Sequence, residues 1–258
     1  MKKYKAYAKV NIFLKITGKR GNYHEIFSRF MKLPNLYDEI SFEPKEEAGF
    51  KLVGSFGCTT EQNTIYKAYK ALQEYTSSTA LASLIDKYAI KVEKNIPSFA
   101  GLGGGSSDAA CFLKMCNTTL DLDLSLSELA NIGSSIGADV PFFIYNYNSA
   151  NVSGIGEIVE KFEEETLDIK TYTPGIEGST PKVYQNFREN FYKELSTDEY
   201  AQLSVKNSRE ILNEYSISDA NDLFEPAINL YPKLKDSYKK DWFFSGSGST
   251  FFKIRETK

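Results

Sequence analysis

The stretch FAGLGGGSSDAA, residues 99–110, constrains the fold of this chain more than any other segment. Four of the five residues 101–105 are glycine, and an apolar run follows the two serines and the aspartate. Apolar periodicity resumes on both sides, which favours a loop inside a folded unit over a flexible linker. YAIKVE before the loop alternates like a strand, and AACFLKMCNTTL after it is typical of a helix. We therefore expect a loop whose backbone N–H groups meet an anion at a helix N-terminus.

Two common glycine motifs do not fit this loop. The Walker A loop ends in Gly-Lys-Ser/Thr, which is absent, and Ser106 stands where a dinucleotide fingerprint has its third glycine. The hydroxyls of Ser106 and Ser107 can bind phosphate oxygens or magnesium, or cap the helix. For Asp108 we expect a structural role, as a cap or as a charge that complements the helix dipole. The loop as a whole is predicted to bind phosphate.

Composition excludes several classes of protein. The net charge of −3 over 258 residues leaves no basic field for a nucleic acid or an anionic membrane, although a few local cations suffice for an anionic small substrate. Three cysteines and a single histidine do not predict a zinc site, and we expect reduced thiols. Lysines interrupt the apolar run after MKKYK, and no stretch approaches the length of a membrane span. We expect a cytoplasmic enzyme, and nothing in the sequence requires a partner chain.

Residues 4–16 show the clearest alternation in the chain. Every even position is apolar or aromatic, and a period of two predicts a strand with one buried face. Lys9 and Asn11 then project together from the polar face. For Lys3, Lys5 and Lys15 we expect solvent exposure.

The remaining elements alternate between helices and strands. From about residue 150 the residues become small and polar, and we expect a domain boundary there. This predicts domains at 1–152 and 153–258 in a mixed α+β protein of two lobes. The further expected elements are strands at 39–43 and 50–53, a helix from Asn63, a helix from Ser125 or Ser127, a buried strand VPFFIY at 140–145, helices at about 197–214 and 219–239, and a hairpin at 241–255.

Three ordered motifs resemble those of the GHMP kinases. PSFAGLGGGSSDAA resembles the second motif of that family, AKVNIFLKITGKRGNYHEI the first and FFSGSGSTFF the third, so the resemblance spans residues 8 to 252. It implies a two-lobed α+β fold, with a ribosomal-protein-S5-like N-terminal lobe and a ferredoxin-like C-terminal lobe. It also implies that the third motif supports the loop of the second.

The same resemblance implies an ATP-dependent kinase that uses magnesium and acts on a small molecule. Asp139 matches the catalytic aspartate, although by itself it would be taken for a turn residue after Gly137 and Ala138. Lys9 matches the lysine that lies beside this aspartate, where opposite charge keeps a carboxylate ionised. The implied ATP-binding residues are Pro97, Ser98, Phe99, Ala100, Gly101, Leu102, Gly103, Gly104, Gly105, Ser106 and Ser107. No residue is assigned to a metal.

The implied acceptor is the 2-hydroxyl of a diphosphocytidyl methylerythritol, a step of non-mevalonate isoprenoid biosynthesis, because GADVPFF and NDLFEPA resemble the members that act on it. Tyr23 and His24 would read the cytosine, and Asn11, Thr180 and Tyr184 would complete the substrate site, with Tyr184 stacking opposite Tyr23. The alternative is a member like homoserine or mevalonate kinase, which would lack the Tyr23–His24 pair.

Two residues depart from the family pattern. Asn22 replaces a glycine before the Tyr-His pair, a mild change because asparagine tolerates left-handed backbone. Phe99 also stands where the family usually has glycine. Because positive φ would strain this side chain, we expect an ordinary negative φ at Phe99.

Overall fold

A computed structural model describes residues 2–193 and 195–255 as an α+β protein. These residues form two compact units, each built from several chain segments. The first unit holds residues 2–8, 34–98 and 103–146, and the second holds 9–33, 99–102, 147–193 and 195–255. The expected domains at 1–152 and 153–258 remain a prediction.

The first two strands contribute to both units. The strand expected at 4–16 extends as β1 over Tyr4–Arg20, and the one expected at 39–43 belongs to a longer strand, β2, over Tyr23–Pro44. β1 pairs with β2, and the turn between them contains Gly21 at φ 58°. Glycine allows this left-handed backbone without a steric penalty.

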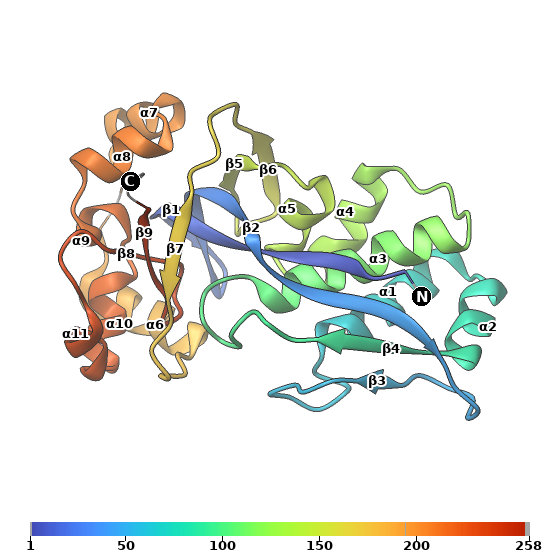
Figure 1. The fold of residues 1–258 in the computed structure, drawn as a ribbon. Coiled ribbons are helices and arrows are strands. Elements are labelled where there is room, and N and C mark those ends of the chain that lie inside the picture. The colour runs from blue at the N-terminus through green and yellow to red at the C-terminus, as the bar shows by residue number, and fades with distance from the viewer. Residues whose placement is uncertain (1, 194, 256–258) are drawn as a thin grey trace. The chain divides into compact units, whose positions relative to one another are not determined.

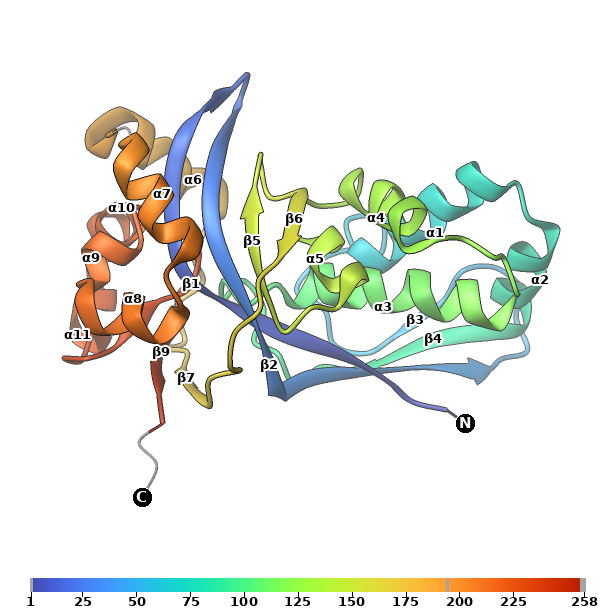
Figure 2. The ribbon, with the colours of Figure 1, turned by 90° about the horizontal axis from the view of Figure 1, so that it is seen from above.

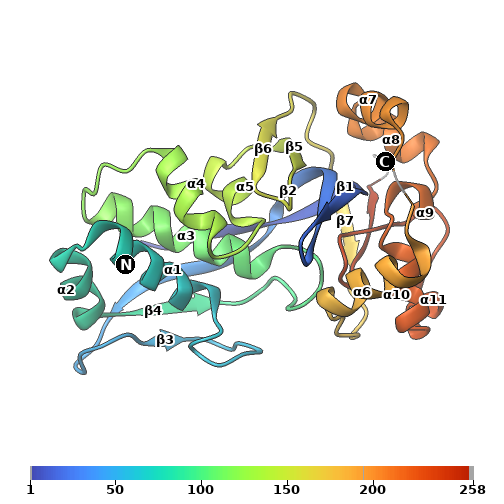
Figure 3. The same cartoon turned by 180° about the vertical axis from the view of Figure 1, so that it is seen from behind.

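In the first unit, β2 pairs antiparallel with β4 (Tyr88–Glu93), and β3 (Leu52–Val53) pairs parallel with β4. Helices α1, α3 and α4 are drawn above strands β3 and β4 in Figures 1 and 3. Helix α3 packs against α1 and α5. The helices are α1 (Thr64–Thr76), α2 (Thr79–Lys87), α3 (Gly104–Thr119), α4 (Leu126–Ser134) and α5 (Val140–Tyr145).

Two of these helices begin at the expected capping residues. The side chain of Asn63 accepts a hydrogen bond from Ile65 N, which confirms the predicted start of α1. Ser125 accepts from Glu128 N while the Glu128 carboxylate accepts from Ser125 N, a reciprocal capping box. This arrangement makes Ser125, rather than Ser127, the N-cap of α4.

The prediction of a buried strand at 140–145 is wrong, because these residues form helix α5. Val140, Phe142 and Ile144 are buried, and so are the residues between them. All sides of this helix are therefore apolar, and its sequence shows no alternation of apolar and polar residues. Pro141 occupies the first turn, where a missing N–H breaks no helical hydrogen bond. Short, uniformly apolar runs carry no period that separates a buried helix from a strand.

In the second unit, β5 (Ser149–Ser153) pairs antiparallel with β2 and with β6 (Ile158–Lys161). Figure 2 shows β5 and β6 side by side. A separate small sheet orders β7 (Ile169–Tyr172), β9 (Phe251–Ile254) and β8 (Phe243–Phe244). The antiparallel pairing of β8 with β9 confirms the predicted C-terminal hairpin.

The two long helices expected between residues 197 and 239 are instead five short ones. Asn207 and Ser216 each cap a new helix, and Pro232 precedes the last one. Phe224, Ala227 and Leu234 from these helices join the buried core of this unit. The helices of the unit are α6 (Thr180–Asn186), continued by a π-helical turn η1 (Phe187–Phe191), then α7 (Thr197–Val205), α8 (Ser208–Glu214), α9 (Ile217–Ala220), α10 (Phe224–Leu230) and α11 (Lys233–Ser237).

The expectation of an exposed Lys15 is also wrong. Its side chain is 2% exposed, and Nζ lies 3.0 Å from Asp222 Oδ1 and 3.0 Å from Glu199 Oε1. Burial acts to lower the pKa of Lys15, but the Asp222 and Glu199 carboxylates outweigh it and the pKa is raised. Helices of the second unit cover the polar face of β1 here, which the alternation could not reveal.

Within residues 2–193 and 195–255, no helix is long and apolar enough to span a membrane. The three cysteines are free thiols, with Cys58 exposed and the other two buried.

Candidate active site

The third glycine-rich motif holds the backbone of residues 99–102. Ser245 Oγ donates to Gly101 O at 3.0 Å, and Thr250 N donates to Ala100 O at 3.2 Å. Gly101 has φ +81°, and a Cβ there would lie 2.2 Å from Ser245 O. A Cβ on Gly248 would lie 2.2 Å from Ala100 C. Only glycine permits this backbone-to-backbone packing, so the third motif supports the loop as the sequence predicted.

The N-cap residue of α3 is Gly103, at φ 71°, which has no side chain to cap the helix. The expected capping role of Asp108 is therefore wrong, and its carboxylate instead pairs with Lys94 Nζ at 2.7 Å. Ser106 lies in the first turn and is half-buried, while Ser107 is buried. A glycine N-cap leaves room for an anion to approach the first N–H groups of this helix, which suits phosphate oxygens.

Phe99 has φ +56°, so the prediction of a negative φ is wrong. Its side chain is 54% exposed. The hydrogen bonds that anchor Ala100 and Gly101 determine the path of the loop, and Phe99 accepts the left-handed conformation that this path requires. Left-handed backbone costs a non-glycine residue about 1–2 kcal/mol.

Lys9 and Asn11 are brought together on β1, as the alternation predicted. Lys9 Nζ donates to Asn11 Oδ1 at 2.6 Å, and Asn11 Nδ2 donates to Ser28 Oγ at 2.9 Å. Ser28 Oγ donates in turn to Phe13 O at 2.5 Å. All three polar side chains are buried, so this chain of hydrogen bonds fixes the position of the Lys9 ammonium. Ser28 carried no signal in the sequence, because its role depends on the pairing of β1 with β2.

Asp139 directly precedes α5 and is half-buried. Val140 N donates to Gly137 O at 3.0 Å, and a Cβ on Gly133 would lie 2.6 Å from Val140 Cγ1. The close packing of α4 on α5 therefore determines where the Asp139 backbone lies in the first unit. Lys9 belongs to the second unit, so the pairing of Lys9 with Asp139 remains a prediction.

His24 and Tyr184 form an aromatic pair in the second unit. Their ring centroids lie 5.2 Å apart with 32° between the planes, and Phe187 contacts His24 edge-on. His24 is 4% exposed, and its Nε2 has no hydrogen-bond partner among the residues described. Burial, with Arg188 and Lys19 nearby, lowers the pKa of His24, so the imidazole is neutral at pH 7.

The other expected substrate residues lie in the same unit. Tyr23 is 65% exposed, and the Tyr184 ring contacts that of His24. The stacking of Tyr184 opposite Tyr23 stays a prediction. Thr180 begins α6, and its Oγ1 lies 2.8 Å from Ser247 Oγ of the third motif. Ser247 was not among the predicted site residues, although the glycine-rich pattern around it could have indicated it.

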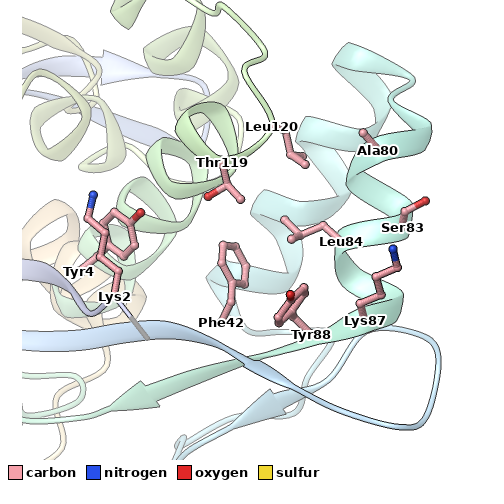
Figure 4. Close-up of a pocket in the computed structure, with 10 residues that line it drawn as sticks. All are labelled: Lys2, Tyr4, Phe42, Ala80, Ser83, Leu84, Lys87, Tyr88, Thr119 and Leu120. Atoms are coloured by element: carbon pink, nitrogen blue, oxygen red, sulfur yellow. The ribbon is translucent and has the colours of Figure 1, made fainter.

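An open cavity of about 670 Å³ lies in the first unit. Figure 4 shows Phe42, Leu84 and Tyr88 among the residues that line it, with Lys2 and Lys87 on opposite sides. None of its lining residues is a predicted site residue. No group of three or more metal-ligating side chains occurs within the described ranges.

Comparison with known proteins places these features in one family. The model for the N-terminal domain of GHMP kinases matches residues 63–147. The chain is 62% identical to a 4-diphosphocytidyl-2-C-methyl-D-erythritol kinase of Sulfurimonas denitrificans, covering 99% of this chain and 98% of the relative. It is 46% identical to the protein of the same name in Sulfurovum, covering 97% and 98%.

Solved structures agree with this grouping. A crystal structure of 4-(cytidine 5'-diphospho)-2C-methyl-D-erythritol kinase covers 99% of this chain and 90% of its own at a TM-score of 0.72 and 29% identity. The mevalonate kinase of Methanococcus jannaschii, at a TM-score of 0.62 and 14% identity over 99% and 90% of the two chains, shares the fold. The chain belongs to the GHMP kinases and, within them, to the 4-diphosphocytidyl-2-C-methyl-D-erythritol kinase family.

Proposed function

We propose that this protein transfers the γ-phosphoryl group of ATP to the 2-hydroxyl of 4-diphosphocytidyl-2-C-methyl-D-erythritol, a step of non-mevalonate isoprenoid biosynthesis. The similarity to kinases of that name extends over almost the whole chain and supports the assignment. The observation that carries the choice of acceptor is the buried His24, whose Nε2 has no hydrogen-bond partner in the described part of the chain. A buried polar atom without a partner costs about 1–3 kcal/mol, and a cytosine edge would satisfy it.

The cytidine end of the substrate would lie in the second unit. A neutral imidazole offers one donor and one acceptor, which suits a base edge with both kinds of group. The tilted Tyr184 ring packs against His24, and the exposed Tyr23 would stack on the base. Thr180, which forms a hydrogen bond with Ser247, would also contact the cytidine end of the substrate.

The ATP phosphates would bind residues 97–107, at the uncapped N-terminus of α3. Ser106, half-buried in the first turn of that helix, offers an oxygen ligand that suits Mg²⁺. Bound with ATP, magnesium would neutralise charge on the phosphates.

Asp139 and Lys9 would act on the acceptor. The oxygen of the acceptor's 2-hydroxyl would bond to the γ-phosphorus while the bond from that phosphorus to the β-phosphate oxygen breaks. Asp139 would accept the proton that this hydroxyl loses. Lys9 is positioned by the hydrogen bonds through Asn11 and Ser28, and its ammonium would stabilise the developing alkoxide. The products are ADP and the phosphorylated acceptor.

The proposed location is the cytoplasm, which suits three free thiols. The alternative acceptor is the substrate of another GHMP kinase, such as homoserine or mevalonate.

Release of ADP with each of the three acceptors tests the function. We expect the cytidyl substrate to stimulate ADP release at least 100-fold over homoserine or mevalonate, because only it satisfies the buried His24 edge. Asp139→Ala serves as the inactive reference, with nucleotide binding retained. Equal rates with homoserine or mevalonate would reject the assignment.

A further inference from the structure

Three charged side chains, the buried Asp38 and Asp108 and the half-buried Lys94, connect the two ends of the phosphate loop within the first unit. Lys94 follows β4, just before the loop, and Asp108 lies on α3, just after it. Lys94 Nζ donates to Asp38 Oδ2 at 2.5 Å and to Asp108 Oδ2 at 2.7 Å. The Asp38 side chain is fully buried and that of Asp108 is 4% exposed. The ammonium thus bridges β2 to the helix that carries the expected phosphate-binding residues.

Asp38 also binds the backbone at the entry to the loop. Its Oδ1 accepts from Asn95 N at 2.5 Å and from Ile96 N at 2.8 Å. Ile96 packs against the start of α3, since a Cβ on Gly104 would lie 3.0 Å from Ile96 Cγ2. One carboxylate on β2 therefore holds the residues that enter the loop and, through Lys94, the helix that leaves it.

The charges in this trio do not balance, because one ammonium faces two carboxylates. Asp108 Oδ1 is buried with no hydrogen-bond partner in the residues described. Burial raises the pKa of Asp108, and Lys94 opposes this shift. Lys94 therefore holds Asp108 in the trio both as an opposite charge and as a hydrogen-bond donor.

We propose that Asp38 is a positioning residue for the ATP phosphates, which holds both ends of the loop at residues 97–107 through Lys94 and the backbone of Asn95 and Ile96. The inference rests on the proposed binding of ATP by this loop. A glycine-rich segment loses much backbone entropy when it is ordered. Anchoring both ends in the free protein removes part of that cost from the binding step.

Asp38→Asn tests this role. The amide keeps an oxygen that accepts from the backbone but presents to Lys94 a nitrogen that cannot accept. We expect KM for ATP to rise about tenfold, the effect of losing one charge-assisted hydrogen bond, while kcat and KM for the cytidyl acceptor change less than twofold. A purely structural role would lower the melting temperature and leave KM for ATP unchanged. Glu43→Gln is the matched control, since this carboxylate on the same strand pairs with Lys91 at the surface.

Asp108→Ala is the second variant, and it keeps the test decisive if Asp38→Asn does not fold. It removes the carboxylate on α3 that accepts from Lys94 Nζ, so KM for ATP should again rise while KM for the cytidyl acceptor changes less than twofold. A KM for ATP within twofold of the parent in folded Asp38→Asn, or in folded Asp108→Ala, would overturn the proposal.

Gly105→Val separates this inference from the proposed function. The glycine is exposed in the first turn of α3, where a side chain would obstruct the phosphates. If Gly105→Val raises KM for ATP while Asp38→Asn does not, only the positioning role fails. If neither variant changes KM for ATP, the loop does not bind the phosphates, and both proposals fail.

Discussion

Phe99 shows how a single residue can be strained by the path of a loop. Its φ of +56° is unfavourable for a side chain, and the ring is 54% exposed, so little packing offsets the cost. We expect Phe99→Gly to be more stable than Phe99→Ala by about 1 kcal/mol, because both lose the ring and only glycine relieves the backbone. Urea unfolding of the two variants measures the difference. An alanine variant as stable as the glycine variant would show that Phe99 adopts negative φ.

At this scale the sequence identified residues whose neighbours lie close in the chain. Lys9 and Asn11 share a face of β1 because strand geometry requires it, and they form a hydrogen bond. The burial of Lys15 was missed, since Asp222, Glu199 and the segments that carry them are distant in sequence. Ser28 and Asp38 were missed for the same reason.

Among the elements, α4 begins with a cap that the sequence narrowed to two serines. Ser125 forms the reciprocal bonds with Glu128, whereas Ser127 lies inside the helix. We expect Ser125→Ala to lower the free energy of unfolding by about 1 kcal/mol, with Ser127→Ala having a smaller effect. Thermal or urea unfolding checks both. Equal losses would mean that the capping box contributes nothing measurable to stability.

Helix α5 marks where prediction of elements failed. A cap is a local pattern, so α1 and α4 were located correctly. The run VPFFIY is buried in full, and its conformation is decided by packing against α3 and α4. The long helices expected after residue 197 failed differently, because capping residues inside them start new helices.

For the whole molecule, Asp108 makes stability depend on pH. Its pKa rises from 3.8 to about 7 on folding, so between these values the folded protein binds more protons than the unfolded chain. The free energy of unfolding contributed by Asp108 therefore falls as the pH rises from 4 to 7. His24 has the opposite effect on stability. Its pKa is lower in the folded protein than in the unfolded chain, so the free energy of unfolding falls as the pH falls below 6.5.

A comparison with Asp108→Asn isolates the first effect. We expect the free energy of unfolding of the variant, minus that of the parent, to increase by at least about 1 kcal/mol from pH 4 to pH 8. Denaturant unfolding of both proteins at each pH measures this difference. His24 is unchanged in the variant, so its contribution cancels. A constant difference between the two proteins would show that Asp108 is not protonated near neutral pH.

Motif order, strand alternation and helix caps were determined by the sequence itself, because each depends on residue types at short, regular spacings. They indicated the family, the phosphate loop and the Tyr23–His24 pair, and the family was confirmed. Only the tertiary structure decided which polar groups are buried and what they face. That is why His24 Nε2 has no hydrogen-bond partner among the described residues, Phe99 has a positive φ and Asp108 pairs with Lys94. Desolvation and long-range pairing govern these properties, and both depend on segments that meet only when the chain has folded.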